Sequence, residues 1–168
     1  MSIKILIVGP AASGKTTLAN KLKEKGFALA KLHTTRPPRD ENDDEYIFTD
    51  KKPDGHPIKC QYNGWWYYIE ASAYKCDVFI VGPKMAQQMK DHGSQLREKF
   101  ITIFLDVPES IRYERLMKRE MPGDSVIARI GRDRADFAHF TDYDIRIHEN
   151  HAEQPDVISN VVSFLKEQ

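Results

Sequence analysis

The chain has 168 residues, with 25 Lys plus Arg, 25 Asp plus Glu and no formal net charge at pH 7. This length favours one domain, because it allows one sizeable core but not two independent ones. The balanced charge argues against stable binding of a long nucleic acid, although it does not exclude a small anion held by a local group of arginines. The two cysteines, Cys60 and Cys76, lack metal-ligand spacing and fit a reducing compartment.

Residues 1–8 run directly into a strand-like segment, without the charged head, apolar stretch and cleavage site of a secretory signal. No apolar run approaches the roughly 20 residues that a membrane helix needs. We therefore expect a cytoplasmic protein that does not enter a membrane.

Strand-like and helix-like segments alternate along the chain. In order, we expect a strand at 3–8, a helix at 15–25, a strand at 27–32, a polar segment at 34–45, strands at 58–62 and 65–70, a strand at 77–81, a helix after Pro83 to about 97, a strand at 100–105, helices at 108–121 and 125–139, a strand at 143–148 and a closing helix around 157–165. This alternation predicts an α/β fold with a central parallel sheet covered by helices on both faces. Asn63-Gly64 suits a tight turn, so the two middle strands are expected to form a small antiparallel insert.

Residues 9–16 fit the phosphate-loop pattern of Gly, four residues, Gly, Lys and Ser or Thr, between a predicted strand and a predicted helix. Glycines let such a loop curl so that its N–H groups point at phosphate oxygens, and the helix N-terminus adds partial positive charge. We expect Lys15 to reach the β- and γ-phosphates of ATP and the Thr16 hydroxyl to bind Mg²⁺. The expected ATP-binding residues are Gly9, Ala11, Ala12, Ser13, Gly14, Lys15, Thr16 and Thr17.

A second motif, Thr-Thr-Arg-Pro-Pro-Arg at 34–39, follows the second predicted strand. Two planar guanidinium groups can grip one phosphate from two sides, and the prolines limit the freedom that is lost on binding. The Asn-Lys-x-Asp base reader of GTPases is absent from the chain. The two motifs together favour a kinase whose acceptor carries a phosphate.

These motifs resemble the guanylate kinase family, and the resemblance continues in Tyr46 and in segments 63–68, 124–132 and 143–150. It implies a P-loop kinase core at 1–33 and 75–168, a nucleoside monophosphate-binding insert at about 34–74 and a helical lid at about 121–136. The implied acceptor-binding residues are Arg36, Arg39, Tyr46 and Tyr67, the implied lid arginines that neutralise the transferred phosphoryl group are Arg129 and Arg132, and Asn150 would lie near the adenine. Lys15 and Arg36 join the lid arginines as expected catalytic residues.

The lid arginines have a simpler alternative interpretation, because many basic residues lie in the same stretch. A solvated basic helix face would contain Arg112, Arg115, Lys118, Arg119, Arg129, Arg132 and Arg134. The acidic run 40–45 is likewise interpreted either as a solvated loop or as an element that closes on the acceptor.

The sequence departs from the family at the positions that read guanine. Leu32 or His33 stands at one of them and Ile58 at the other, and an apolar side chain cannot accept from the base. His33, Gln61 and Asp77 are then the candidates for contacts with the base. The third strand also lacks the family's Asp pair at its end, so Mg²⁺ would depend on Thr16, water and Asp106.

We therefore expect transfer of the ATP γ-phosphate to a nucleoside or deoxynucleoside 5′-monophosphate, with (d)GMP as the favoured acceptor. One alternative is a P-loop kinase that acts on another deoxynucleotide, or on a modified base or nucleotide in DNA. A second alternative is a non-catalytic interaction module, against which Lys15 and Thr16 argue because such modules have usually lost the lysine. Small-molecule nucleotides are the expected partners, and the oligomeric state is left open.

Overall fold

The computed structural model describes residues 3–95, 98–119, 125–148 and 155–167. Its main sheet has the order β6-β1-β7-β8, and every pairing between neighbouring strands is parallel. The strands are β1 (Ile3–Val8), β6 (Val78–Ile80), β7 (Lys99–Asp106) and β8 (Ile145–His148). The helices are α1 (Lys15–Glu24), α2 (Pro83–Gln95), α3 (Glu109–Lys118), α4 (Val126–Phe137) and α5 (Pro155–Lys166).

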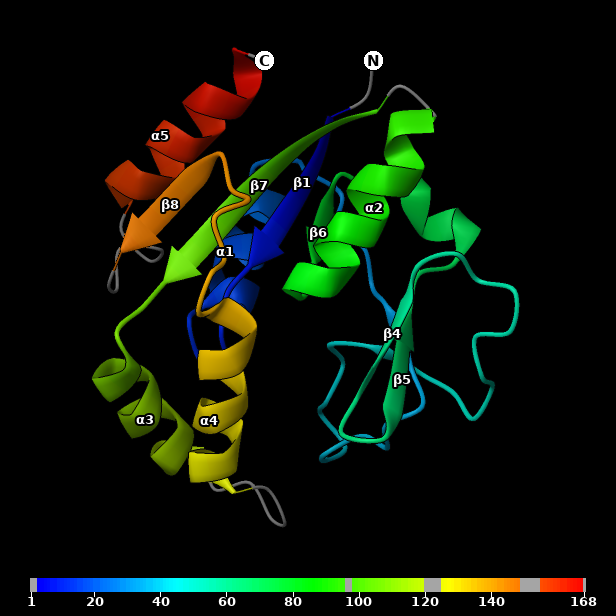
Figure 1. Cartoon of the computed structure of the whole chain (residues 1–168). Helices are drawn as coiled ribbons and strands as arrows, with labels where there is room; N and C mark the ends of the chain where they lie inside the picture. Colours follow the sequence, from blue (N-terminus) through cyan, green and yellow to red (C-terminus); the bar gives the residue numbers. More distant parts are fainter. Residues whose placement is uncertain (1–2, 96–97, 120–124, 149–154, 168) are drawn as a thin grey trace.

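Alternate residues of the central strand β1 enter two separate cores. Ile5 and Ile7 pack in the core that α1 and α5 cover, whereas Leu6 and Val8 pack in the core that α2 covers. Because successive side chains of a strand point to opposite faces, a run of apolar residues is needed when both faces are buried. The prediction of a parallel sheet with helices on both faces is confirmed, as Figure 1 shows.

The predicted strand at 27–32 is not a regular strand. Only Leu29 forms a bridge, to Val78, and the N–H of Ala30 donates to Val78 O at 2.9 Å. The neighbouring strand β6 has three residues, so this edge of the main sheet supports little further pairing. The chain then leaves the main sheet and forms β2 (His33–Thr34) in a second sheet.

The second sheet has the order β3-β2-β5-β4, with β3 (Ile47–Phe48), β4 (Lys59–Tyr62) and β5 (Trp65–Tyr68). The predicted hairpin is present, and Asn63 and Gly64 take the positive φ values of 51° and 80° that a two-residue turn requires. The two hairpin strands are antiparallel as expected, and the second sheet as a whole is mixed because β2 and β3 run parallel. A 3₁₀ helix, η1 (Ala71–Lys75), leads back to the main sheet.

Helices α3 and α4 lie beyond the carboxyl ends of β1 and β7 (Figure 1). Helix α4 begins after Ser125, whose side chain accepts a hydrogen bond from the N–H of Ala128 at 3.3 Å. This hydrogen bond satisfies one free donor of the first turn. The first residues of the expected lid, 121–124, lie outside the described residues. Within the described residues, every helix is too short or too polar to cross a membrane.

Candidate active site

The phosphate loop connects β1 to α1, as the sequence predicts. Ala12 and Gly14 have left-handed backbone conformations, with φ of 61° and 94°. Such residues turn consecutive N–H groups into a concave arrangement that binds anions. At Gly9, a Cβ atom would lie 2.7 Å from Ser13 Oγ and 2.9 Å from Leu105 O, so a side chain does not fit there. The glycine at position 9 is therefore required by packing against β7.

Lys15 lies within this loop. Its Nζ donates to the carbonyl oxygens of Gly9 at 2.8 Å and of Pro10 at 2.9 Å. Burial lowers the pKa of Lys15 to about 8, although the carboxylates of Asp133 and Glu45 act to raise it. Because burial removes water from this ammonium group, pairing with a phosphate oxygen would lower its free energy.

Two arginines contribute to the positive charge around Lys15. Arg119 and Arg129 each act to lower the pKa of Lys15, which means that both lie within electrostatic range of its ammonium group. Arg129 is one of the two lid arginines expected from the sequence, whereas Arg119 follows α3 and is expected only as part of a solvated basic face. Phosphoryl transfer is accelerated by positive charge next to the phosphoryl group that moves.

The loop hydroxyls have different surroundings. Ser13 Oγ is buried and has no hydrogen-bond partner among the described residues. Thr16 Oγ1 donates to Glu45 Oε1 at 3.1 Å, which links the loop to the acidic segment that precedes β3. Thr17 is half-buried in the first turn of α1. A buried hydroxyl without a partner costs free energy.

Side chains of α3 and α4 hold the outer side of the phosphate loop. The N–H of Ala11 donates to Asp133 Oδ2 at 3.0 Å, and Arg112 Nη1 donates to the same oxygen at 3.1 Å. Arg115 Nη1 donates to Ala12 O at 2.8 Å. The sequence does not predict the pair of Arg112 and Asp133, whose side chains are 7% and 8% exposed. The only sequence signal was the run of basic residues along α3.

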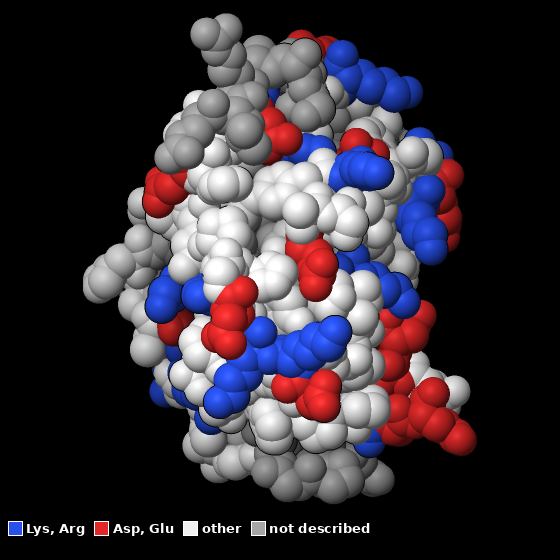
Figure 2. Space-filling view, turned by 90° about the vertical axis from the view of Figure 1, so that its right-hand side faces the viewer, with Lys and Arg blue, Asp and Glu red and all other residues white. Residues whose placement is uncertain are grey.

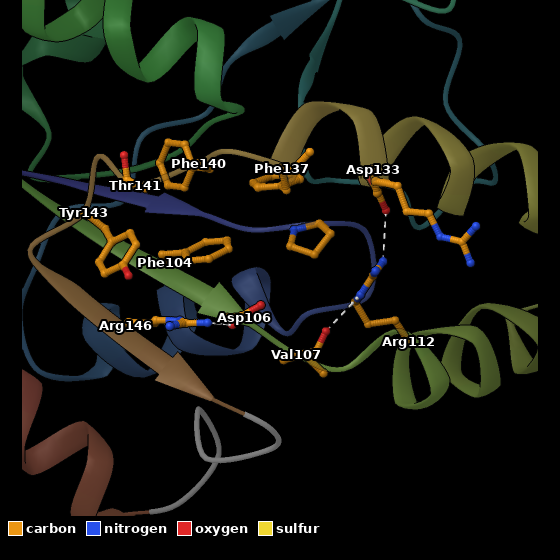
Figure 3. A pocket seen from close by; sticks show the side chains of 13 residues that line it. Phe104, Asp106, Val107, Arg112, Asp133, Phe137, Phe140, Thr141, Tyr143 and Arg146 are labelled. Carbon is orange, nitrogen blue, oxygen red and sulfur yellow. Dashed lines mark hydrogen bonds and ion pairs between the residues drawn. The ribbon is translucent and has the colours of Figure 1, made fainter.

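A cavity of about 440 Å³ lies beside this network, next to Pro10. Figure 3 shows its aromatic wall, in which the ring of Phe104 lies 5.7 Å from that of Phe137 and 5.5 Å from that of Tyr143. The cavity also contains Asp106, whose carboxylate is paired with Arg146. Because Pro10 belongs to the phosphate loop, this cavity adjoins the predicted nucleotide site, although among the described residues none of those expected to bind ATP or the acceptor lines it.

Residues 34–45 contain the motif expected to bind the acceptor and are called the acceptor segment. This segment is organised around Arg36. Its Nη2 is 2.9 Å from Asp43 Oδ2, and its guanidinium lies 5.5 Å from the ring centre of Tyr46 and 5.3 Å from that of Phe48. The Arg36 side chain is 12% exposed, and its Nε has no hydrogen-bond partner among the described residues. Arg36 is therefore held rigidly while one buried donor stays available.

Asp43 connects the two arginines of this segment, because Oδ2 also accepts from the N–H of Arg39 at 3.0 Å. Burial acts to raise the pKa of Asp43, but the hydrogen bonds from Arg39 and Arg36 outweigh it and hold the pKa below its ordinary value. Tyr46 and Tyr67 are neighbours, with ring centres 5.5 Å apart. Burial raises the pKa of Tyr46 to about 12, so its hydroxyl stays protonated and can donate to an anion.

Glu45 joins the acceptor segment to the phosphate loop. Besides accepting from Thr16, its carboxylate lies 3.7 Å from Arg39 Nη1. The acidic run 40–45 thus contains one member that reaches the loop, in addition to Asp43, which fixes the arginines. Asp43 and Glu45 therefore do not fit the interpretation of this run as a solvated loop.

The structure does not place His33 and Gln61 with the other acceptor residues. In β4 and β5, Cys60 pairs with Tyr67 whereas Gln61 pairs with Trp66, so Gln61 lies on the opposite face from Tyr67. Gln61 Nε2 donates to Gly64 O in the turn, and the ring of His33 stacks on that of Tyr68 at 5.1 Å. Leu32 and Ile58 are 5% and 0% exposed and belong to the core that α2 covers.

The second lid arginine, Arg132, contacts the second sheet. Its Nε donates to Tyr62 Oη at 3.2 Å, and its guanidinium lies 5.5 Å from the centre of the Tyr62 ring. Helix α4 and the β4–β5 hairpin therefore touch through these two side chains. Asn150, expected near the adenine, lies outside the described residues.

Basic and acidic side chains are interspersed on the face that Figure 2 shows, and blue side chains do not merge into one wide area there. This pattern agrees with the equal numbers of the two charge types.

Comparison with known proteins agrees with this geometry. Residues 5–135 match the model of a family described as AAA domain. Among solved structures, a guanylate kinase from Anaplasma phagocytophilum is 20% identical, with a TM-score of 0.66 over 99% of this chain and 85% of that one. A sugar kinase from a Janibacter species is 15% identical, with a TM-score of 0.57 over 99% and 95%. An uncharacterized protein from Eubacterium ventriosum is 15% identical, with a TM-score of 0.52 over the full length of both chains.

The sequence matches no curated protein. At identities of 20% or less the structural likenesses establish the fold, and they leave the reaction open. The family match, by contrast, spans well over half of the chain. The protein therefore belongs to this AAA domain family, and its fold is that of a guanylate kinase-like P-loop NTPase.

Proposed function

We propose that the protein transfers the γ-phosphate of ATP to a nucleoside or deoxynucleoside 5′-monophosphate and releases ADP. The observation that carries this proposal is the carboxylate of Glu45, which contacts both Thr16 in the phosphate loop and Arg39 in the acceptor segment. The phosphate loop and Arg39, which are both suited to bind phosphate, thus lie on either side of the Glu45 side chain. Transfer between two bound phosphates needs this proximity more than it needs a covalent nucleophile.

The residues of the site would have separate roles in the reaction. The phosphate loop with Lys15 holds the phosphates of ATP. Arg36, with Tyr46 and Tyr67 beside it, holds the acceptor phosphate, and its unpaired Nε supports this role. The charge of Arg129 acts to lower the pKa of Lys15, which supports a role for Arg129 in neutralising charge on the phosphoryl group, whereas Arg132 donates to Tyr62 in this structure.

The donors at the loop suit Mg²⁺ that arrives with ATP. Among the described residues, no group of three or more His, Cys, Asp or Glu could hold a metal ion by itself. Mg²⁺ typically takes one or two protein oxygens and completes its shell with phosphates and water. The Thr16 hydroxyl and the neighbouring Glu45 carboxylate fit this donor set. When bound, the ion would screen the charge of the phosphates.

We favour (d)GMP as the acceptor, with weaker base discrimination than a full set of hydrogen-bond readers gives. Leu32 and Ile58 are apolar and buried, and His33 and Gln61 lie away from the face that carries Tyr67. None of these four supports a contact with the guanine edge. A preference above about 10⁴ in kcat/KM for one monophosphate would contradict this part of the proposal.

A coupled assay of ADP release over all ribo- and deoxynucleoside monophosphates tests the proposal. We expect at least one monophosphate to raise ADP release far above the rate with ATP alone, and Lys15→Ala to remove the increase. If no monophosphate raises the rate of the folded wild-type protein, the proposal fails.

A kinase for a hydroxyl acceptor is the second candidate. Glu45 supports it, since a carboxylate near the phosphate loop can act as the general base for a hydroxyl. The similar structure from Janibacter is described as a sugar kinase. The same assay with sugars, nucleosides and DNA that carries hydroxymethylated bases distinguishes this candidate, because these acceptors offer a hydroxyl group rather than a phosphate monoester as the group that is phosphorylated.

A further inference from the structure

Few carboxylates of the described chain are placed to assist a metal ion at the phosphate loop. Asp106, which the sequence suggested for this role, is paired with Arg146 and lies 3.6 Å from His148 Nδ1. Asp133 is buried and accepts from Arg112 and from the N–H of Ala11. Strand β6 ends at Ile80 and is followed by Val81 and Gly82, which provide no acid.

Glu45 differs from these residues because its carboxylate touches the hydroxyl that is expected to bind the metal. Thr16 Oγ1 donates a hydrogen bond to Glu45 Oε1, which leaves the lone pairs of the Thr16 oxygen available for a cation. The Glu45 side chain is 40% exposed, so water and ions can reach it. Its position is supported on the other side by Arg39 at 3.7 Å.

The spacing of the two oxygens also suits Mg²⁺. The ion holds oxygen ligands at about 2.1 Å in octahedral geometry, which places adjacent ligands about 3 Å apart. Thr16 Oγ1 and Glu45 Oε1 are 3.1 Å apart. Both oxygens therefore fit neighbouring positions around one ion without a large movement of either side chain.

We propose that Glu45 positions the Mg²⁺ of bound ATP, by binding the ion itself or one of its waters. This proposal rests on the proposed function, because the ion is brought by the nucleotide. The acid thus comes from the acceptor segment rather than from the end of a core strand. The metal site is completed only when residues 40–45 lie against the phosphate loop, which couples the position of the acceptor arginines to the nucleotide.

Glu45→Gln tests the proposal, because it removes the charge and keeps the shape of the side chain. Asp44→Asn is the matched control: it removes the same charge one residue away, from a side chain that is 88% exposed and paired with Lys31 at 3.4 Å. The probes are Mn²⁺, followed by its paramagnetic resonance, and ADP, titrated by calorimetry with Mn²⁺ and separately with EDTA.

We expect Glu45→Gln to weaken Mn²⁺ binding to the protein with ADP by about tenfold or more, the usual effect of losing a group that supports a metal site. ADP binding in EDTA should be unchanged or tighter, because a negative charge near the phosphates is removed. Asp44→Asn should leave both affinities within about twofold of wild type, since an exposed charge at this distance is screened.

Three outcomes would overturn the inference. In the first, Mn²⁺ affinity is the same in Glu45→Gln and Asp44→Asn. In the second, activity falls in Glu45→Gln while Mn²⁺ affinity is unchanged, which assigns Glu45 to proton transfer instead. In the third, metal-dependent and metal-free ADP binding fall together, which assigns it a purely structural role. A wild-type protein that binds no ADP under either condition would remove the proposed function, and this inference with it.

Discussion

Removing the Asp133 carboxylate should destabilise the protein strongly. Its Oδ2 accepts from the N–H of Ala11 and from Arg112 Nη1, and both charged side chains are less than a tenth exposed. In Asp133→Ala, the Arg112 charge keeps its hydrogen bond to Val107 O at 3.1 Å but loses its counter-ion. Breaking a buried pair in this way typically costs about 3–5 kcal/mol.

This loss is large beside the total stability of a domain, about 5–15 kcal/mol. With a urea dependence of about 2 kcal/mol per molar, it corresponds to a fall of about 2 M in the unfolding midpoint. Urea unfolding followed by far-ultraviolet circular dichroism measures the shift. Arg134→Ala is the control, because this neighbouring residue forms an exposed pair with Glu109 and its loss should move the midpoint much less.

Replacing both partners separates the penalty for an unpaired charge from the contribution of the pair itself. The double variant Arg112→Met and Asp133→Leu should recover most of the lost stability, because an apolar pair of similar volume often substitutes for a buried ion pair. A midpoint for Asp133→Ala within about 0.5 M of wild type would refute the reasoning, since it would mean that the buried charge is not left uncompensated.

Three further predictions concern the site. Lys15→Ala should abolish turnover in a folded protein; a remaining rate above about a tenth of wild type contradicts its role, because transition-state contacts of this kind contribute at least that much. The pKa of Lys15 is lowered from 10.5 to about 8, so at this residue the unfolded chain binds more protons between these values, and stability should rise with pH from 8 to 10.5 more steeply, or fall less steeply, than in a variant without the lysine. The raised pKa of Tyr46 acts in the opposite direction in both proteins. Lys15→Met is such a variant, and equal slopes of urea midpoint against pH in both proteins would be inconsistent with the lowered pKa. Arg36→Ala should raise the KM for the acceptor by about tenfold or more and leave ATP affinity nearly unchanged; titrations that show lost ATP binding and intact monophosphate binding would place the acceptor site elsewhere.

Much of the main sheet could be predicted because its residues carry strong local patterns. The apolar run at 3–8 is buried on both faces, and residues 9–16 determine the loop and the start of α1 almost by themselves. The hairpin could also be predicted in detail. A two-residue turn at 63–64 sets Tyr62 opposite Trp65 and hence Gln61 opposite Trp66, so the face of Gln61 follows from the sequence alone.

The parts that could not be predicted depend on contacts between distant residues. Glu45 is 29 residues from Thr16 and Asp133 is 21 residues from Arg112. No local pattern distinguishes Glu45 from the other acids of the run 40–45, or Asp133 from the charged residues around it. The segment 27–32 has the composition of a strand, but its only bridge is from Leu29 to Val78, in a strand about 50 residues away in the sequence.

The placement of the tryptophans allows intrinsic fluorescence to follow the second sheet separately from the rest of the molecule. The chain has two, Trp65 and Trp66, and both lie in strand β5. Trp65 is 41% exposed and Trp66 is half-buried, so their emission is sensitive to the water that surrounds this strand. Intrinsic fluorescence thus reports on the second sheet, whereas circular dichroism is dominated by the helices that cover the main sheet. Recording both signals on one sample gives separate transitions for the two sheets if they unfold independently, and one shared transition if they unfold as a unit.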